Sequence, residues 1–215
     1  LIGSFMTYDP ELYIPLTFLT YQFENLIFGL NPLIFHLTSL VLHLASVFLV
    51  LWSVFLLAQR RNDDTVAAWI AGTCALVFAL HPISTEAVAW AAARKDVLST
   101  FFFFLSLGLY LKGNRTWSIA TFALGLLAKV SIIMLPIVLI LVDSYAATED
   151  VQSVRAGAAN RAKNWISSVA KEKWPWFALS FVFGIVALLG KTVQLTTVTL
   201  VEKFLLSSKA ILFYL

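Results

Sequence analysis

The sequence predicts an all-α fold, a bundle of several membrane-crossing helices accompanied by amphipathic helices that lie in the membrane interface. Two observations predict it. Hydrophobic residues make up 60% of the 215 residues and charged residues only 13%, whereas a soluble domain is roughly 45–50% apolar and about 25% charged. The apolar residues also occur in long runs of helical length. We therefore expect lipid to be the main solvent of this chain, which argues against a soluble globular domain.

Seven apolar runs supply the expected membrane-crossing helices of a single domain over residues 1–215. A helix needs about 20 apolar residues to cross the hydrocarbon core, and a shorter one requires a thinned bilayer or shielding by protein. Prolines, glycines or charged residues close most of the runs. The expected spans are residues 34–58, 66–80, 97–111, 117–128, 132–142, 176–190 and 204–215. Because the chain starts without methionine and ends inside an apolar run, we expect a partial membrane domain.

Lys129 divides the apolar stretch from Trp117 to Val142 into two short spans. A lysine at mid-bilayer costs about 2.5–3.5 kcal/mol on insertion scales, so we expect a turn that water can reach at this position. With this division, nine basic residues fall on one side of the membrane and six on the other. Since Lys and Arg are enriched in cytoplasmic loops, the side with nine is expected to be cytoplasmic.

Two amphipathic segments are expected to lie along the membrane surface. Residues 15–30 carry an apolar stripe with the period of a helix. Residues 151–169 repeat apolar positions at three- and four-residue steps, and Arg155, Arg161 and Lys163 among them can reach anionic headgroups. We interpret this second segment as a connector on the cytoplasmic side.

Polar residues at the ends of the spans gather on the expected non-cytoplasmic side. They are His81, Glu86, Arg94, Lys95, Asp96 and Lys129. Each charge at a membrane edge must be hydrated, paired or buried in protein. Arg94 and Lys129 have the chemistry to bind a phosphate or pyrophosphate. Asp96 and Glu86 can order those cations, bind a metal or transfer a proton. An internal network of salt bridges among Arg94, Asp96 and Glu86 is an equally supported alternative.

The other polar residues near this region are expected to support the structure. Residues 82–96 are expected to include a short shallow helix with Ser84 or Thr85 as its N-cap. His36 and His43 lie seven residues apart, whereas zinc-binding pairs on a helix are four apart. We therefore expect these histidines to form hydrogen bonds between helices and to bind no metal.

Short motifs follow one another in a distinctive order along the first two thirds of the chain. They are Tyr13-Ile14-Pro15-Leu16-Thr17, Phe28-Gly29-Leu30-Asn31-Pro32, His36, Leu42-His43, Phe78-Ala79-Leu80-His81-Pro82, Thr85-Glu86-Ala87-Val88-Ala89-Trp90, Arg94-Lys95-Asp96-Val97-Leu98-Ser99-Thr100, Leu126-Leu127-Ala128-Lys129, Leu135-Pro136 and Leu141-Val142-Asp143. In this order and spacing they resemble the membrane part of the TPR-containing GT-C glycosyltransferases. That group includes bacterial multi-span TPR proteins and eukaryotic transmembrane-and-TPR O-mannosyltransferases. The resemblance runs from about Tyr13 to Asp143 and continues weakly to Leu215.

The resemblance implies a GT-C-like membrane glycosyltransferase module. Such an enzyme transfers a sugar from a polyprenyl-phosphate donor to a protein hydroxyl on the non-cytoplasmic side. Arg94 and Lys129 are expected to bind the lipid phosphate. The pocket-shaping residues are then His81, Glu86 and Asp96.

The catalytic acid of this family precedes the block that begins at Tyr13. Only Asp9 and Glu11 are acidic there, and neither lies in a recognisable family motif. We therefore expect the catalytic acid upstream of Leu1, and this fragment alone to be inactive. Lys129 is followed by Val130, where the family often has an acidic residue or proline.

Two other functions stay open at this stage. Broken spans with charged ends also describe transporter sites, so a transporter-like subunit is one alternative. A non-catalytic membrane scaffold subunit of a larger complex is the other. The expected partners are membrane lipids, the lipid-linked sugar and an acceptor protein, with no nucleic acid. No metal ligands are assigned, and a divalent metal as cofactor is left open. The expected location is multi-pass in a bacterial inner membrane or the endoplasmic reticulum.

Overall fold

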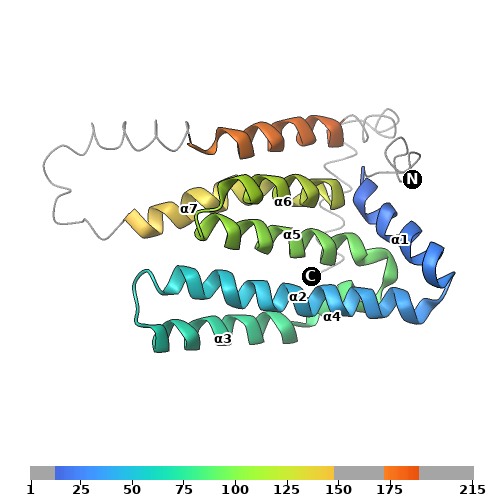
Figure 1. Cartoon of the computed structure of the whole chain (residues 1–215), viewed down its shortest axis with the longest axis horizontal. Helices are drawn as coiled ribbons and strands as arrows, with labels where there is room; N and C mark the ends of the chain where they lie inside the picture. The colour runs from blue at the N-terminus through green and yellow to red at the C-terminus, as the bar shows by residue number, and fades with distance from the viewer. Residues whose placement is uncertain (1–12, 148–171, 189–215) are drawn as a thin grey trace, which may run out of the picture.

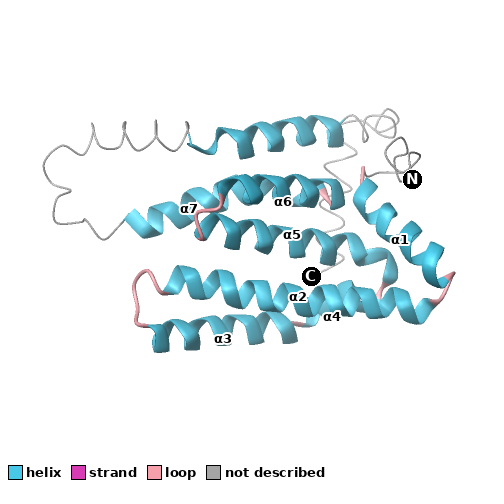
Figure 2. Cartoon of the chain, viewed as in Figure 1, coloured by secondary structure: helices cyan, strands magenta, loops and turns pink. Residues whose placement is uncertain are grey.

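The computed structural model describes residues 13–147 and 172–188, which form helices joined by short connections, with no strand among them. The fold is all-α, as the sequence predicts (Figure 2). Most helices run along one common direction, and α1 crosses one end of the bundle obliquely (Figure 1). The connections therefore gather at two opposite ends, and the site described below lies at the end that carries α1.

Helices α1 (Pro15–Phe28) and α2 (Pro32–Ala58) each begin with a proline. Proline suits this position because its fixed φ is helical and its missing N–H is one that the helix leaves unpaired. Gly29, at φ 66°, ends α1 in the left-handed region. The Asn31 side chain then caps α2 by accepting a hydrogen bond from the Leu33 N–H at 3.1 Å. The turn between the two helices is thus specified locally.

Helices α3 (Asp64–Leu80) and α4 (Pro82–Ala89) follow, and they meet at an angle of 55°. Buried alanines at 67, 71 and 75 let α3 approach α2 closely. The bend falls at His81, in front of the proline that opens α4.

The N-cap of α4 differs from the sequence prediction. His81 has extended backbone, and its Nδ1 accepts the Ile83 N–H at 3.2 Å. The prediction of Ser84 or Thr85 as N-cap was therefore wrong. Pro82 starts the helix two residues before Ser84, so the capping position falls on the residue preceding the proline.

Helices α5 (Arg94–Leu111) and α6 (Arg115–Ala128) form a tightly paired hairpin, preceded by the short helix η2 (Ala91–Ala93). The Ser106 hydroxyl donates to the Ser118 carbonyl at 2.7 Å, and the Ser118 hydroxyl donates to the Ser106 carbonyl at 2.9 Å. Such reciprocal bonds between small residues join helices that have little other polar chemistry.

The backbone breaks at Lys129, where the sequence predicts a turn. Lys129 has extended geometry, with φ −163° and ψ 130°, after α6 has ended at Ala128. The short helix η3 (Val130–Met134) and then α7 (Leu135–Ala147) follow. Helix α7 runs back beside α5. The two helices are joined near the end of α5, where the Tyr110 hydroxyl donates a hydrogen bond to Asp143 at 2.7 Å. Lys129 and Asp143 therefore lie at opposite ends of the bundle.

The core lies between α5, α6, α7 and the helix over residues 172–188. Its centre is apolar, with Phe122, Leu126, Leu135, Leu139 and Trp176 almost without accessible surface. The last of these comes from the helix over residues 172–188, drawn in orange in Figure 1. This helix therefore belongs to the same packed body as α5 to α7.

Large apolar side chains also cover the outside of the described helices. Examples are Leu44, Phe48, Trp69 and Leu76, each more than half exposed. Among the described residues, α2 alone is long and apolar enough by itself to span a membrane. The bent pair α3 and α4 passes the same test when taken as one span.

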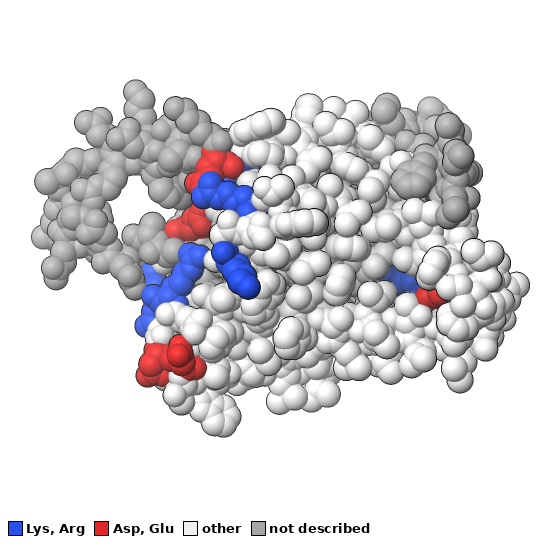
Figure 3. Space-filling model, viewed as in Figure 1, with Lys and Arg blue, Asp and Glu red and all other residues white. Residues whose placement is uncertain are grey.

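Charged side chains gather at the two ends of the bundle, with a broad uncharged surface between them (Figure 3). Among the described residues, six stretches of at least 13 residues contain no Asp, Glu, Lys or Arg, namely residues 33–58, 65–80, 97–111, 116–128, 130–142 and 174–188. The Lys129 end holds Glu24, Glu86, Arg94, Lys95, Asp96 and Lys129. The Lys112 end holds Arg60, Arg61, Asp63, Asp64, Lys112, Arg115, Asp143, Glu172 and Lys173.

Three predicted elements lie wholly or partly outside the described residues. These are the amphipathic segment 151–169, the last span 204–215 and the end of the span 176–190. Of the predicted elements that are described, residues 15–30 correspond to α1. Helix α5 starts at Arg94, three residues before the predicted start of its span at residue 97.

Candidate functional site

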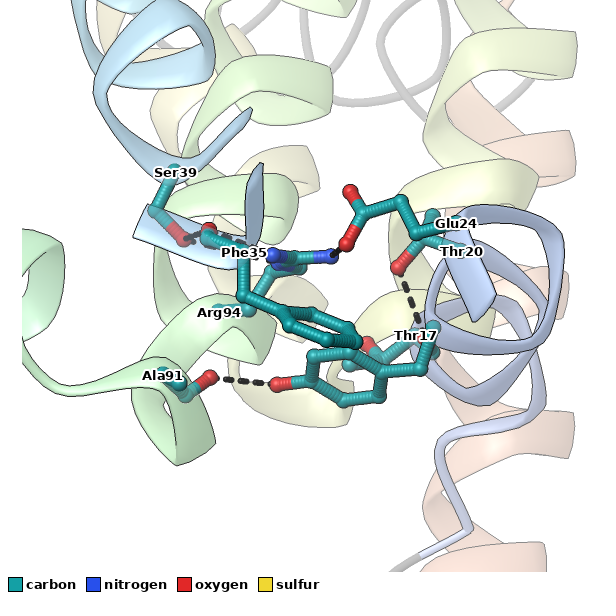
Figure 4. Close-up of polar contacts among 8 residues, drawn as sticks. Thr17, Thr20, Glu24, Phe35, Ser39, Ala91 and Arg94 are labelled. Atoms are coloured by element: carbon teal, nitrogen blue, oxygen red, sulfur yellow. Dashed lines mark hydrogen bonds and ion pairs between the residues drawn. The ribbon is translucent and has the colours of Figure 1, made fainter. Parts of the chain in front are cut away.

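Arg94 is fully buried and joins three helices at the Lys129 end of the bundle. It opens α5, where its guanidinium lies between Glu24 of α1 and the first turns of α2 (Figure 4). It donates to Glu24 at 2.6 Å, to the Phe35 carbonyl at 2.6 Å and to the Ser39 hydroxyl at 3.4 Å. Its side chain has 0% exposure and that of Glu24 has 8%.

Aromatic rings complete the enclosure of this guanidinium. The Arg94 carbon Cζ lies 4.6 Å from the centre of the Tyr21 ring and 5.4 Å from that of Phe35. The Tyr21 hydroxyl in turn donates to the Ala91 carbonyl, just before α5. Arginine suits such a site because a planar guanidinium both stacks on rings and forks its hydrogen bonds. The whole cluster fixes α1 across the start of α5.

This burial changes the role that the sequence suggests for Arg94. A phosphate can contact Arg94 only if Glu24 or a neighbouring helix moves, because no part of the guanidinium reaches the surface. Arg94 does form a salt bridge, but not with the partners that the sequence suggested. The partner is Glu24, and neither Asp96 nor Glu86 pairs with Arg94 among the described residues.

Lys129, like Lys95, is a partly accessible cation of this end, and it forms an ion pair with Asp96. The relative accessible surface of the side chain is 24% for Lys129 and 40% for Asp96. Asp96 lies in the first turn of α5 and Lys129 in the break after α6, so the pair bridges the hairpin. Next to it, the Thr17 hydroxyl donates to the Ala128 carbonyl at 3.1 Å, which ties α1 to the same break. Because Lys129 is partly exposed, another anion can take the place of the Asp96 carboxylate on its ammonium group.

A cavity of about 420 Å³ lies beside this ion pair, between α2, α4 and α5. Six of its lining residues are polar, which is unusual for so apolar a bundle. They are His43, Ser46, Ser84, Glu86, Asp96 and Thr100. The sequence-predicted residues Glu86 and Asp96 are therefore brought together on one cavity.

His81 does not line this cavity. It is exposed, its Nδ1 caps α4, and it lines an adjoining hollow with Thr73 and Cys74. The hollow shares Phe78, Ile83 and Ser84 with the cavity. Two histidines are expected to join helices. The Nε2 atom of His43 on α2 lies 3.4 Å from the carbonyl oxygen of Ala79 on α3. His36 is exposed on α2. In the described part of the chain, no three His, Cys, Asp or Glu side chains form a group that could hold a metal.

The Lys112 end carries a second buried charge. Lys173 has 0% side-chain exposure and pairs with Asp143, which also accepts from Tyr110. Beside it, Glu172 pairs with Arg115. These contacts fasten the first turn of the helix over residues 172–188 to α5, α6 and α7, so we assign them a structural role.

Sequence reasoning missed Glu24 and the burial of Lys173. Glu24 lies off the apolar stripe of residues 15–30, and that pattern gives it no partner. The available signal was that Glu24 is the only charged residue within Pro15–Phe28, so its carboxylate needs a partner at that depth. No sequence pattern indicates that Lys173 is buried, because its neighbours Asp143 and Tyr110 come from helices distant in the chain.

No protein-family model, curated protein or solved structure matches this chain.

Proposed function

We propose that this chain is a multi-pass membrane protein and the membrane part of a GT-C-like transferase. The donor would be a polyprenyl-phosphate-linked sugar, and the acceptor a protein hydroxyl. The observation that carries the proposal is the Lys129–Asp96 pair, an accessible cation held at one charged end of an apolar helical bundle. The ordered sequence motifs that resemble the family support the choice of reaction.

The dimensions of the helices support a membrane as the surroundings. Helix α5 has 18 residues, a length of roughly 27 Å at about 1.5 Å per residue. The hydrocarbon core of a bilayer is about 30 Å thick. Charges at both ends of α5 and none between match that thickness. The excess of basic residues supports a cytoplasmic location for the Lys112 end and the opposite location for the Lys129 end.

In this proposal, Lys129 binds the lipid phosphate. The incoming phosphate takes the place of the Asp96 carboxylate on the ammonium, since both are oxygen anions that accept its hydrogen bonds. Lys129 then stabilises the charge that develops on the phosphate as the sugar leaves. Asp96, released from the ion pair, is free to accept hydrogen bonds from hydroxyl groups.

Arg94 takes a positioning role in the same proposal. It stands two residues before Asp96 and is fixed by Glu24 and the Phe35 carbonyl. The first turn of α5, with Asp96 on it, therefore has one defined position. This replaces the direct phosphate contact that the sequence suggested for Arg94.

Binding of undecaprenyl phosphate to the protein in phosphatidylcholine nanodiscs tests the role of Lys129. Native mass spectrometry over a series of lipid concentrations gives the Kd. We expect Lys129→Gln to weaken binding by roughly 10-fold or more, because a hydrogen bond to a charged group is worth about 1.5–3 kcal/mol. We expect Asp96→Asn to strengthen binding, since the competing carboxylate is removed.

Lys112→Gln is the matched control, because it removes the same charge at the opposite end. Equal losses in Lys129→Gln and Lys112→Gln would mean that only overall charge attracts the lipid, and the proposal would fail. Weaker binding in Asp96→Asn would contradict the exchange of anions on Lys129.

A non-catalytic scaffold is the second candidate. The observation that favours it is Arg94, whose hydrogen bonds all serve to join helices. A scaffold would bind undecaprenyl phosphate no better than phosphatidylcholine in the nanodisc experiment, with or without Lys129.

A further inference from the structure

The cavity between α2, α4 and α5 has a lining that neither an anion nor an apolar group would match. Glu86 of α4 and Asp96 of α5 contribute two carboxylates to its lining, and these repel a phosphate. Ser46 and His43 lie deeper along α2, and Thr100 lies one turn further along α5 than Asp96. The cavity thus offers hydrogen-bonding groups on several sides.

The polar groups of this cavity retain capacity for a ligand. Neither Glu86 nor Thr100 is bonded to another described side chain or backbone group, so the carboxylate and the hydroxyl are available. The Ser46 hydroxyl donates to the Leu42 carbonyl at 2.8 Å, which leaves its oxygen lone pairs able to accept. A ligand that both donates and accepts hydrogen bonds would satisfy all of these groups.

The size and the aromatic wall narrow the class of ligand. About 420 Å³ falls in the range of roughly 300–1,000 Å³ that small-molecule sites occupy. Phe78 supplies an aromatic surface in the same cavity. The apolar face of a pyranose ring packs on such a ring while its hydroxyls reach carboxylates and hydroxyls. Carboxylates are strong acceptors for hydroxyl donors.

We propose that this cavity is a pyranose-binding site in which Glu86, Asp96 and Thr100 hold the sugar hydroxyls. The inference rests on the proposed function, and it places the sugar of the donor inside the cavity and its phosphate outside, on Lys129. The Lys129–Asp96 pair connects the two, because Asp96 lines the cavity and its ion-pair partner Lys129 does not.

Saturation-transfer NMR with methyl glycosides tests the cavity. The probes are methyl α-mannoside, methyl α-glucoside and methyl β-N-acetylglucosaminide, with the protein in phosphatidylcholine nanodiscs so that no sugar detergent competes. At least one glycoside should bind. Glu86→Gln and Thr100→Val should each weaken it by roughly fivefold, as expected for one lost hydrogen bond. Thr73→Val, on the hollow beside His81, is the matched control and should leave binding unchanged.

The outcomes separate this inference from the proposed function. If none of the three glycosides binds, or if Thr73→Val weakens binding as much as Thr100→Val, the cavity inference is overturned. Lipid phosphate binding that depends on Lys129 would stand in either case. If glycosides bind through Glu86 and Thr100 but undecaprenyl phosphate does not bind, the proposed function fails while the sugar site remains.

Competition identifies the source of the sugar. Undecaprenyl-phospho-mannose should displace the bound methyl glycoside, whereas bare undecaprenyl phosphate should not. Displacement by neither lipid would mean that the cavity takes a sugar of the acceptor, which would overturn the placement of the donor sugar there.

Discussion

At the scale of residues, the two ion pairs of the Lys129 end differ in what they can do. Arg94 and Glu24 are enclosed on all sides, so their charges serve only each other and the helices around them. Lys129 and Asp96 keep part of their surface, so water and ligands can reach them. Exposure, and not the type of charge, thus separates the structural pair from the candidate binding pair.

Removing one partner of the buried pair should be far more damaging than removing both. We expect Glu24→Gln to lower stability by about 3–5 kcal/mol, because it leaves the buried Arg94 charge without a counter-ion. The double variant Glu24→Gln with Arg94→Met should recover much of that loss. Thermal unfolding of the wild type, Glu24→Gln, Arg94→Met and the double variant in nanodiscs measures the difference as a double-mutant cycle. Additive effects in this cycle would show that the pair is not coupled.

The sequence could predict that Lys129 is special but not that Arg94 is closed off. Lys129 interrupts an apolar run, and the insertion cost of a lysine is a local property that a sequence displays. The partner of Arg94 is 70 residues away on α1, and no spacing rule connects the two positions. Glu86 and Asp96 line one cavity, whereas His81, which precedes Pro82, caps α4.

At the scale of elements, the bundle is held together by small residues and short polar contacts between long apolar helices. Gly108 of α5 shows this most clearly, because a Cβ at that position would overlap the Trp52 ring of α2. The Ser53 hydroxyl on α2 also donates to the Phe104 carbonyl of α5 at 3.2 Å. Close backbone approach of this kind is how helices associate in lipid, where hydrophobic driving force is weak.

Adding a methyl group at Gly108 should therefore separate α2 from α5. We expect Gly108→Ala to cost about 1–3 kcal/mol of stability, since the Trp52 ring must shift in a packed core. Gly72→Ala on α3 is the control, because nothing lies within 4 Å of its added Cβ. That control should be neutral or slightly stabilising in a helix. A melting temperature lowered equally in both variants would contradict the packing argument.

Helix existence was more predictable than helix boundaries. The apolar runs and prolines gave α2, α3, α5 and the break after α6 close to where they occur, because periodicity and breakers act locally. The predictions for the start of α5 and for the cap of α4 were misplaced. The start of α5 at Arg94 involves tertiary contacts with α1 and α2, whereas the cap at His81 follows from the adjacent Pro82.

At the scale of the whole molecule, the separation of charges into two ends gives the chain its expected orientation in a membrane. The described helices cross an uncharged zone and return, and connections with opposite expected locations alternate along the chain. Both proposed sites require that the Lys129 end and the Lys112 end face opposite sides of one bilayer. If they do not, neither the proposed lipid-phosphate site nor the proposed sugar cavity has access to its substrate.

Cysteine accessibility in sealed right-side-out membrane vesicles tests this claim most directly. In a Cys74→Ser background, one variant carries Asn31→Cys, at the α1–α2 turn of the Lys129 end. The other carries Asn62→Cys, at the α2–α3 turn of the Lys112 end. We predict that a membrane-impermeant maleimide labels Asn31→Cys in intact vesicles and labels Asn62→Cys only after the membrane is opened. Labelling of both cysteines in intact vesicles, or of Asn62→Cys alone, would contradict the account.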